Sequence, residues 1–228
     1  METETWFSEQ REFTMGNGLF SKRQLKPSEL GYPPERLILP EERIKNEYAA
    51  LCYIRDNTTI PIPEIESFGR DENDSLKLVT GIVAGKMLED FDDEERPAVL
   101  EAVDQQMERH IFPQPQKLQR DSVGCVDESL PVIAPNCLMY KHRRPFWRRV
   151  TSDTPSFVFC HNDLSGFNII LNPDTYEIAA IIDWEYAGFF PAWFDRRLWR
   201  ERYNKRNWDE VDKYIEDAKD FFDKDAPK

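Results

Sequence analysis

The spacing of hydrophobic and polar residues predicts several helices and strands along the chain. Apolar residues recur near a 3.6-residue period over residues 41–57, which predicts a helix. Two short runs at 64–68 and 76–80 are separated by a polar turn and predict a β-hairpin. Helical spacing returns over residues 97–111 and again from Trp208 towards the C-terminus. The elements therefore change in type several times, and no internal repeat is visible.

Two further segments have a distinctive composition. Residues 11–40 mix short apolar runs with glycine and proline, which predicts short strands or turns. Residues 141–149 form a basic segment with interleaved aromatic side chains. We interpret this segment as a solvated helix that buries Phe146 and Trp147, in preference to a phosphate-binding site.

Composition limits the class of protein. The 228 residues are 40% hydrophobic and 13% aromatic, which is far too apolar for a disordered chain. That length suffices for one large domain or two lobes around a sizeable core. The net charge of −13 opposes binding to a phosphate backbone, so we expect no nucleic-acid partner. A cationic or neutral small molecule suits this charge better.

The chain also lacks the patterns of an exported or membrane protein. Its first residues are acidic and polar, without the basic and apolar regions of a secretory signal. No segment has eighteen uninterrupted apolar residues, so we expect a cytoplasmic protein without a membrane partner. The four cysteines are widely spaced, which favours reduced thiols over disulfides or a zinc site.

The strongest chemical signal lies between residues 157 and 185. An apolar strand at 157–160 is followed by a loop that contains Asp163 and Asn168, and a second apolar strand follows at 169–171. A turn and a returning strand at 178–182 then bring Asp183 back to the same end.

These three side chains suit phosphoryl transfer from ATP. Mg²⁺ prefers oxygen ligands and keeps several waters, so the amide of Asn168 and the carboxylate of Asp183 are enough protein ligands. Asp163 would accept or orient the proton of an attacking hydroxyl group. We expect His161 to brace the loop by hydrogen bonding rather than to act as the base. A metal-dependent hydrolase built on His161, Asp163 and Asp183 is a weaker alternative, because such sites usually recruit more ligands.

Residues 159–170 and 180–191 resemble the catalytic loop and the metal-binding segment of the aminoglycoside phosphotransferase and choline kinase family, in the style of its fungal members. The resemblance implies an α+β, two-lobed, protein-kinase-like fold. Its N-lobe, residues 1–81, would be a small antiparallel sheet with one helix, and its C-lobe, residues 82–228, would be larger and mainly helical. It also implies that ATP and Mg²⁺ bind between the lobes and that the acceptor is a hydroxylated small molecule, which could be cationic.

The resemblance also implies a role for each matching residue. Asp163 would be the catalytic base within the loop that begins at His161, and Asn168 and Asp183 would be the Mg²⁺ ligands. Glu47 would be the helix glutamate that orients a lysine on the phosphates. Residues 78–85 are similar to the segment that joins the lobes, where the backbone of Gly81 and Val83 would hold adenine.

The N-terminal part departs from the family pattern. It has no G-x-G-x-x-G, and Gly16-Asn17-Gly18 is a weak substitute for a phosphate-covering loop. The strand expected before the Glu47 helix would be residues 36–39, which contain no lysine, so Lys22 and Lys26 are the candidates. A divergent or shortened N-lobe therefore leaves a second hypothesis open, namely a catalytically silent nucleotide-binding or interaction protein on the same fold.

Overall fold

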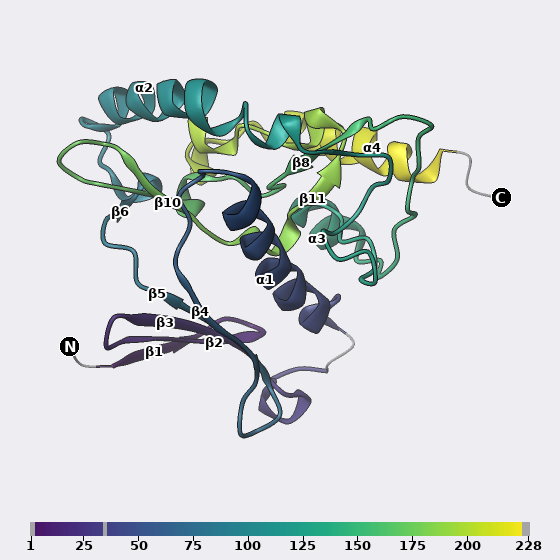
Figure 1. Cartoon of the computed structure of the whole chain (residues 1–228), viewed down its shortest axis with the longest axis horizontal. Coiled ribbons are helices and arrows are strands. Elements are labelled where there is room, and N and C mark those ends of the chain that lie inside the picture. The colour runs from purple at the N-terminus through teal and green to yellow at the C-terminus, as the bar shows by residue number, and fades with distance from the viewer. Residues whose placement is uncertain (1–2, 34–35, 225–228) are drawn as a thin grey trace.

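The computed structural model describes residues 3–33 and 36–224 and places a five-stranded sheet beside a larger C-terminal region (Figure 1). The strands pair antiparallel in the order β1-β2-β3-β5-β4. They are β1 (Glu4–Phe7), β2 (Arg11–Gly16), β3 (Leu19–Gln24), β4 (Ile65–Arg70) and β5 (Leu76–Gly81). The predicted hairpin at 64–68 and 76–80 is confirmed as β4 and β5.

The glycine pair at the β2–β3 connection forms a hairpin turn. Asn17 and Gly18 both have positive φ, at 52° and 79°, as a two-residue primed turn requires. The carbonyl of Gly18 accepts a hydrogen bond from the amide of Ile82 at 2.9 Å. Gly16-Asn17-Gly18 therefore lies beside the segment after β5, at the opposite end of β2 from Arg11, and is not a phosphate-covering loop.

Helix α1 (Pro40–Asn57) confirms the helix predicted at 41–57 and lies between the sheet and the C-terminal region (Figure 1). Pro40 occupies the first turn, where its missing N–H is not needed. The helix buries Ile44 and Ile54 in the core. It also buries polar side chains towards the site, namely Arg43, Asn46 and Glu47.

Two hydrogen bonds from Asn46 fix α1 against the C-terminal region. The amide of Asn46 donates to the carbonyls of Glu185 and Ala187 at 3.0 and 2.8 Å, which ties the helix to the segment after Asp183. The predicted strand at 36–39 is wrong. These residues form bends rather than a strand, because the chain turns at Leu39, with φ 50°, directly into the helix.

Up to residue 224, the C-terminal region combines three α-helices with two small three-stranded sheets, ordered β10-β9-β6 and β11-β8-β7. The predicted helix at 97–111 is regular to Gln106 and continues as a π-helical turn, Met107–Ile111. The predicted β9–β10 hairpin and the helix from Trp208 are confirmed. The elements are β6 (Lys86–Met87), α2 (Arg96–Gln106), β7 (Gln119–Arg120), α3 (Asn136–His142), β8 (Phe157–Cys160), β9 (Ile169–Leu171), β10 (Ile178–Ile181), β11 (Gly188–Phe190) and α4 (Trp208–Asp223).

The basic segment 141–149 corrects one expectation. Only its first two residues belong to α3, because Arg143 takes a left-handed conformation with φ 50° and Pro145 follows. Trp147 is buried at 5% exposure, but Phe146 is 77% exposed, so half of the predicted burial is wrong. The four cysteines are free thiols. Within residues 3–33 and 36–224, no helix combines the length and apolarity that crossing a membrane would require.

Candidate active site

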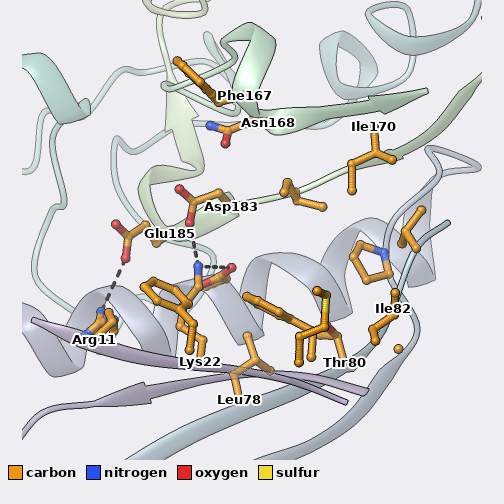
Figure 2. Close-up of a pocket in the computed structure, with 18 of the residues that line it drawn as sticks. Arg11, Lys22, Leu78, Thr80, Ile82, Phe167, Asn168, Ile170, Asp183 and Glu185 are labelled. Carbon is orange, nitrogen blue, oxygen red and sulfur yellow. Dashed lines mark hydrogen bonds and ion pairs between the residues drawn. The ribbon is translucent and has the colours of Figure 1, made fainter. Parts of the chain in front are cut away.

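A cavity of about 710 Å³ lies between the inner face of the five-stranded sheet and the loops of the C-terminal region. Gly81, at the end of β5, and Val83, just after it, line the cavity. Lys22 lines it from β3, and Asn168 and Asp183 line it from the opposite side (Figure 2). Glu47 also lines it, from α1. The structure therefore brings these six sequence-predicted residues to one cavity. His161 and Asp163 belong to the loop that carries Asn168, but neither is among the described residues that line the cavity.

One end of the cavity is apolar and aromatic. Trp6, Phe13 and Phe20 come from three adjacent strands and line it together. Their rings stack in sequence, with centroids 5.6 Å apart for Trp6 and Phe13 and 6.0 Å apart for Phe13 and Phe20. Flat apolar surfaces of this kind suit a planar ring such as a nucleobase.

Lys22 lies at the centre of the polar end. Because side chains alternate along a strand, Lys22 shares the cavity face of β3 with Phe20. Its ammonium lies 2.8 Å from Oε2 of Glu47 and 2.6 Å from Oδ1 of Asp183. Burial alone would lower the pKa of Lys22, but these two carboxylates raise it above its ordinary value, so Lys22 is a cation. Lys26 makes no ion pair with any described carboxylate within 4.0 Å.

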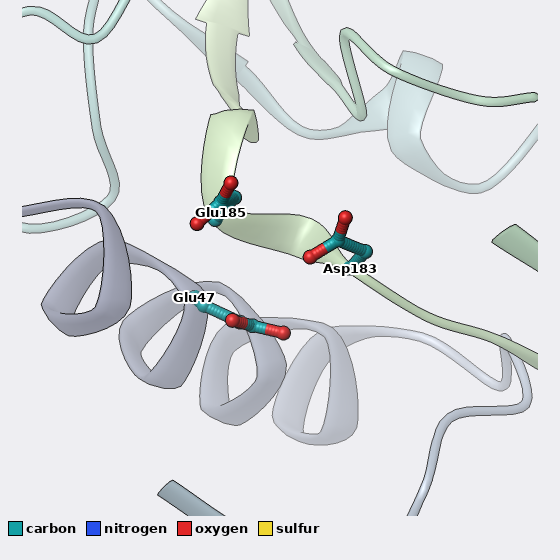
Figure 3. A group of neighbouring side chains, drawn as sticks. All are labelled: Glu47, Asp183 and Glu185. Atoms are coloured by element: carbon teal, nitrogen blue, oxygen red, sulfur yellow. The ribbon is translucent and has the colours of Figure 1, made fainter. Parts of the chain in front are cut away.

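Three carboxylates meet around this lysine. Glu47, Asp183 and Glu185 each place an oxygen within 4.8 Å of the others (Figure 3). Burial raises the pKa of Glu47 to about 7, and the neighbouring carboxylates add to that shift while Lys22 opposes it. Glu185 is neutralised separately, by Arg43 at 3.0 Å and Arg11 at 3.4 Å.

Asp183 is the carboxylate of this group that is best placed to accept a further cation. Its side chain is 33% exposed, whereas those of Glu47 and Glu185 are 6% and 11% exposed. Asp183 also has a left-handed backbone, with φ 65°, directly before the short helix Trp184–Tyr186. The left-handed conformation costs free energy for a non-glycine residue, and such strain is common at functional sites.

Asn168 is oriented by the backbone of its own loop. Its side-chain amide nitrogen donates to the carbonyl of Asp163 at 2.7 Å. That bond fixes the side chain so that the amide oxygen points towards Asp183, on the same side of the cavity (Figure 2). An amide oxygen opposite a carboxylate is the ligand set that Mg²⁺ accepts, so these residues fit that ion.

His161 uses both ring nitrogens inside the protein. Nδ1 accepts a hydrogen bond from the amide of Asp163 at 3.2 Å, so Nε2 carries the proton and donates to the carbonyl of Ile182 at 3.0 Å. Burial lowers the pKa of His161 to about 4, which keeps the ring neutral. His161 thus joins the loop to the returning strand and has no free nitrogen for a metal, which argues against the hydrolase alternative.

Asp163 is a half-buried carboxyl group with one side-chain hydrogen bond to the described part of the chain. Its Oδ2 accepts from the side-chain amide of Asn136 at 3.1 Å. Burial, followed by the charges of Asp183 and Glu185, raises the pKa of Asp163 to about 8. Asp195 also fixes the backbone of this loop, because its Oδ1 accepts hydrogen bonds from the amides of His161 and Asn162 at 3.2 Å each.

Sequence reasoning missed four residues of this site, namely Arg11, Arg43, Asn136 and Asp195. Each is remote in sequence from the group it contacts, so no local motif marks it. Arg43 alone had a usable signal, since it lies one helical turn before Glu47 and therefore shares its face.

Comparison with known proteins gives a family and a fold. A family model described as "Phosphotransferase enzyme family" matches residues 32–220. The solved structure of an aminoglycoside-3'-phosphotransferase of type VIII is 17% identical with a TM-score of 0.54, over 99% of this chain and 88% of that chain. A thermostable mutant of aminoglycoside phosphotransferase APH(4)-Ia is 12% identical with a TM-score of 0.51, over 83% and 69%.

A further structure of a thermostable APH(4)-Ia mutant, in a ternary complex with AMP-PNP and hygromycin B, is 13% identical with a TM-score of 0.50, over 83% of this chain and 68% of that chain. No curated protein matches the sequence at a significant level. Identities this low show a common fold, so the predicted α+β, kinase-like architecture is confirmed. The division into lobes at residues 81 and 82 stays a prediction.

Proposed function

Because the chain belongs to the phosphotransferase enzyme family, we propose that it transfers the γ-phosphoryl group of ATP to a hydroxyl group of a small molecule. One observation carries this proposal. A buried lysine, Lys22, is paired with a helix glutamate and contacts Asp183, in a cavity that Asn168, Gly81 and Val83 also line. The triphosphate of ATP needs cations and its adenine ring needs apolar walls. The cavity offers cations at its polar end and apolar walls at its aromatic end.

The walls of the cavity suit adenine at the end near β5. The amide of Gly81 is already bonded to the carbonyl of Glu64 at 2.8 Å, and that of Ile82 to Gly18 at 2.9 Å. The N–H of Val83 has no hydrogen-bond partner among the described residues. We assign this N–H to the edge of the base, and Phe20 to its face.

The polar end suits the phosphates and their metal ion. Lys22 would contact phosphate oxygens, and Glu47 would hold it in place. Asn168 and Asp183 are the residues that would hold Mg²⁺. When bound, that ion supplies positive charge that stabilises the charge on the phosphates during transfer.

Asp163 would receive the acceptor hydroxyl group. A carboxyl group with a pKa near 8 is a stronger base than an ordinary aspartate, which suits it to take the proton of the hydroxyl. Asn136 fixes one carboxyl oxygen and leaves the other for the acceptor. His161 keeps the loop in position from the other side.

The charge of the acceptor stays a prediction. The net charge of −13 favours a cationic or neutral molecule, but several acidic side chains near 90–95 and in α4 are already neutralised. Asp93 pairs with Arg202 at 2.9 Å and Asp212 pairs with Lys141 at 2.8 Å. The APH(4)-Ia complex contains hygromycin B, which supports a hydroxylated acceptor of small size.

The proposal is tested by Asp163→Asn. Turnover of Mg-ATP with a panel of hydroxylated acceptors should fall by roughly 100-fold or more, because the base is lost. Calorimetric titration with Mg-ATP should show that affinity is retained, which separates lost chemistry from lost folding. A wild-type protein that binds Mg-ATP without turnover on any acceptor would favour the silent nucleotide-binding alternative instead.

A further inference from the structure

The turn between β1 and β2 closes on itself. The amide of Ser8 donates to the carbonyl of Arg11 at 2.9 Å. The hydroxyl oxygen of Ser8 accepts from the amides of Gln10 and Arg11 at 3.4 and 3.1 Å. Ser8 and Gln10 line the cavity, but three of the four amides of residues 8–11 are therefore already used. A glycine-rich loop binds phosphate through free backbone amides, and this turn has almost none to offer.

Arg11 presents the opposite situation, because it has donors without acceptors. It begins β2 and lines the cavity on the same strand face as Phe13, whose cross-strand partner is Lys22. The residue is only 3% exposed. Its Nη2 donates to the carbonyl of Pro40 at 2.8 Å and lies 3.4 Å from Oε2 of Glu185. Its Nε and Nη1 are buried without a hydrogen-bond partner among the residues that the structure describes.

Buried unpaired donors of a charged group are costly, so they indicate a missing ligand. Glu185 does not explain the position of Arg11, because Arg43 already pairs with it at the shorter distance of 3.0 Å. Arg43 also bonds to the hydroxyl of Tyr186 at 2.6 Å and does not line the cavity. Figure 2 shows Arg11 and Lys22 along the sheet, with Glu185 and Asp183 facing them.

We propose that Arg11 is a second phosphate-binding cation beside Lys22. Its guanidinium supplies the N–H donors that the amides of the β1–β2 turn do not provide. The planar group has several donors, so it can keep its contact with Pro40 and still bind phosphate oxygens. This assignment rests on the proposed function, since the phosphates are those of ATP.

The test measures binding rather than turnover. Adenosine, ADP with Mg²⁺ and AMP-PNP with Mg²⁺ are titrated calorimetrically into the wild type, Arg11→Gln and Arg43→Gln. For Arg11→Gln we expect an unchanged Kd for adenosine and a Kd for AMP-PNP that is raised roughly 10- to 100-fold, as for loss of hydrogen bonds to a charged group. Arg43→Gln is the matched control, because Arg43 pairs with the same Glu185 but does not itself line the cavity.

Each outcome decides the assignment. A loss that is equal for adenosine and AMP-PNP would overturn it, and so would an equal phosphate-dependent loss in Arg43→Gln. If Arg11→Gln does not fold, Arg11→Lys keeps the charge but has fewer donors, and its Kd for AMP-PNP should rise while that for adenosine stays constant. A wild type that binds none of the three probes would contradict the proposed function itself, which is a different failure.

Discussion

The ammonium of Lys22 lies 2.6 Å from Oδ1 of Asp183, so the lysine contacts the carboxylate that we assign to Mg²⁺. The same nitrogen lies 2.9 and 2.8 Å from the two oxygens of Glu47. Lys22 therefore holds together the sheet, α1 and the segment after β10. When Mg²⁺ and nucleotide bind, Asp183 would gain a second cation beside Lys22.

The first prediction concerns the structural part of that role. Lys22→Met leaves the buried Glu47 and the partly exposed Asp183 without their cation, so we expect the free energy of unfolding to fall by about 3–5 kcal/mol. Adding Glu47→Gln should recover much of this loss, because it removes the unpaired charge. Turnover should be lower than in the wild type by roughly 100-fold or more in both variants, because both lack the positive charge that stabilises the phosphates during transfer.

Urea denaturation and a turnover assay check both parts. Lys26→Met is the matched control, since Lys26 has no ion pair with any described carboxylate and its loss should change neither quantity. Full recovery of turnover in the double variant would contradict the phosphate-binding role of Lys22.

The second prediction concerns Asn136, which donates to Asp163 at 3.1 Å. This hydrogen bond favours the charged form and thus lowers the pKa of Asp163, against the larger effect of burial. Asn136→Ala should therefore raise that pKa further, so less of the base is deprotonated at neutral pH. We expect the low-pH limb of the kcat/KM profile to move to higher pH, with unchanged affinity for Mg-ATP. An unmoved limb would show that Asn136 does not act on Asp163.

The sequence could predict the centre of the site because its residues lie in one short stretch. Local turns fix the loop from His161 to Asn168 and the hairpin that leads to Asp183. The spacing of these segments therefore predicts that Asn168 and Asp183 lie close together. Helix 41–57 and strands β4 and β5 likewise follow from local periodicity, which does not depend on distant partners.

Other parts depend on contacts that no local pattern records. Lys22 and Glu47 are 25 residues apart, and Arg43 and Glu185 are 142 residues apart. The sequence indicated Lys22 and Lys26 as candidates for the phosphate-binding lysine but could not distinguish them. The register of the sheet decides which lysine faces α1. Phe146 is exposed for a related reason, since the left-handed Arg143 ends α3 before the aromatic residues.

The third prediction concerns the close approach of Gly188 to Gly124. A Cβ at Gly188 would lie 2.4 Å from the carbonyl oxygen of Gly124, which is backbone and cannot move aside. Gly188→Ala should therefore lower the free energy of unfolding by about 1–3 kcal/mol, as for overpacking in a filled core. Gly69→Ala is the control, because no atom of the described residues lies within 4 Å of its Cβ position in β4. Thermal denaturation compares the two, and equal effects would contradict the steric explanation.

The last prediction concerns the pH dependence of stability at Asp195. Burial raises the pKa of Asp195 to about 6, although the amides of His161 and Asn162 oppose the shift. An unfolded aspartate has a pKa of about 3.9, so between these values the folded protein binds more protons than the unfolded chain. The contribution of Asp195 to stability is therefore greatest below pH 4 and decreases as the pH rises to about 6.

Asp195→Asn removes this dependence but keeps an oxygen that can accept from both amides. The variant should become more stable relative to the wild type as the pH rises from 4 to 6, by on the order of 3 kcal/mol, with no further change above that range. Urea denaturation at several pH values measures the difference, and the exposed residue Glu101, changed to Gln, controls for the loss of one negative charge. A constant difference over this range would mean that burial does not perturb Asp195, and that its carboxylate holds the catalytic loop without cost.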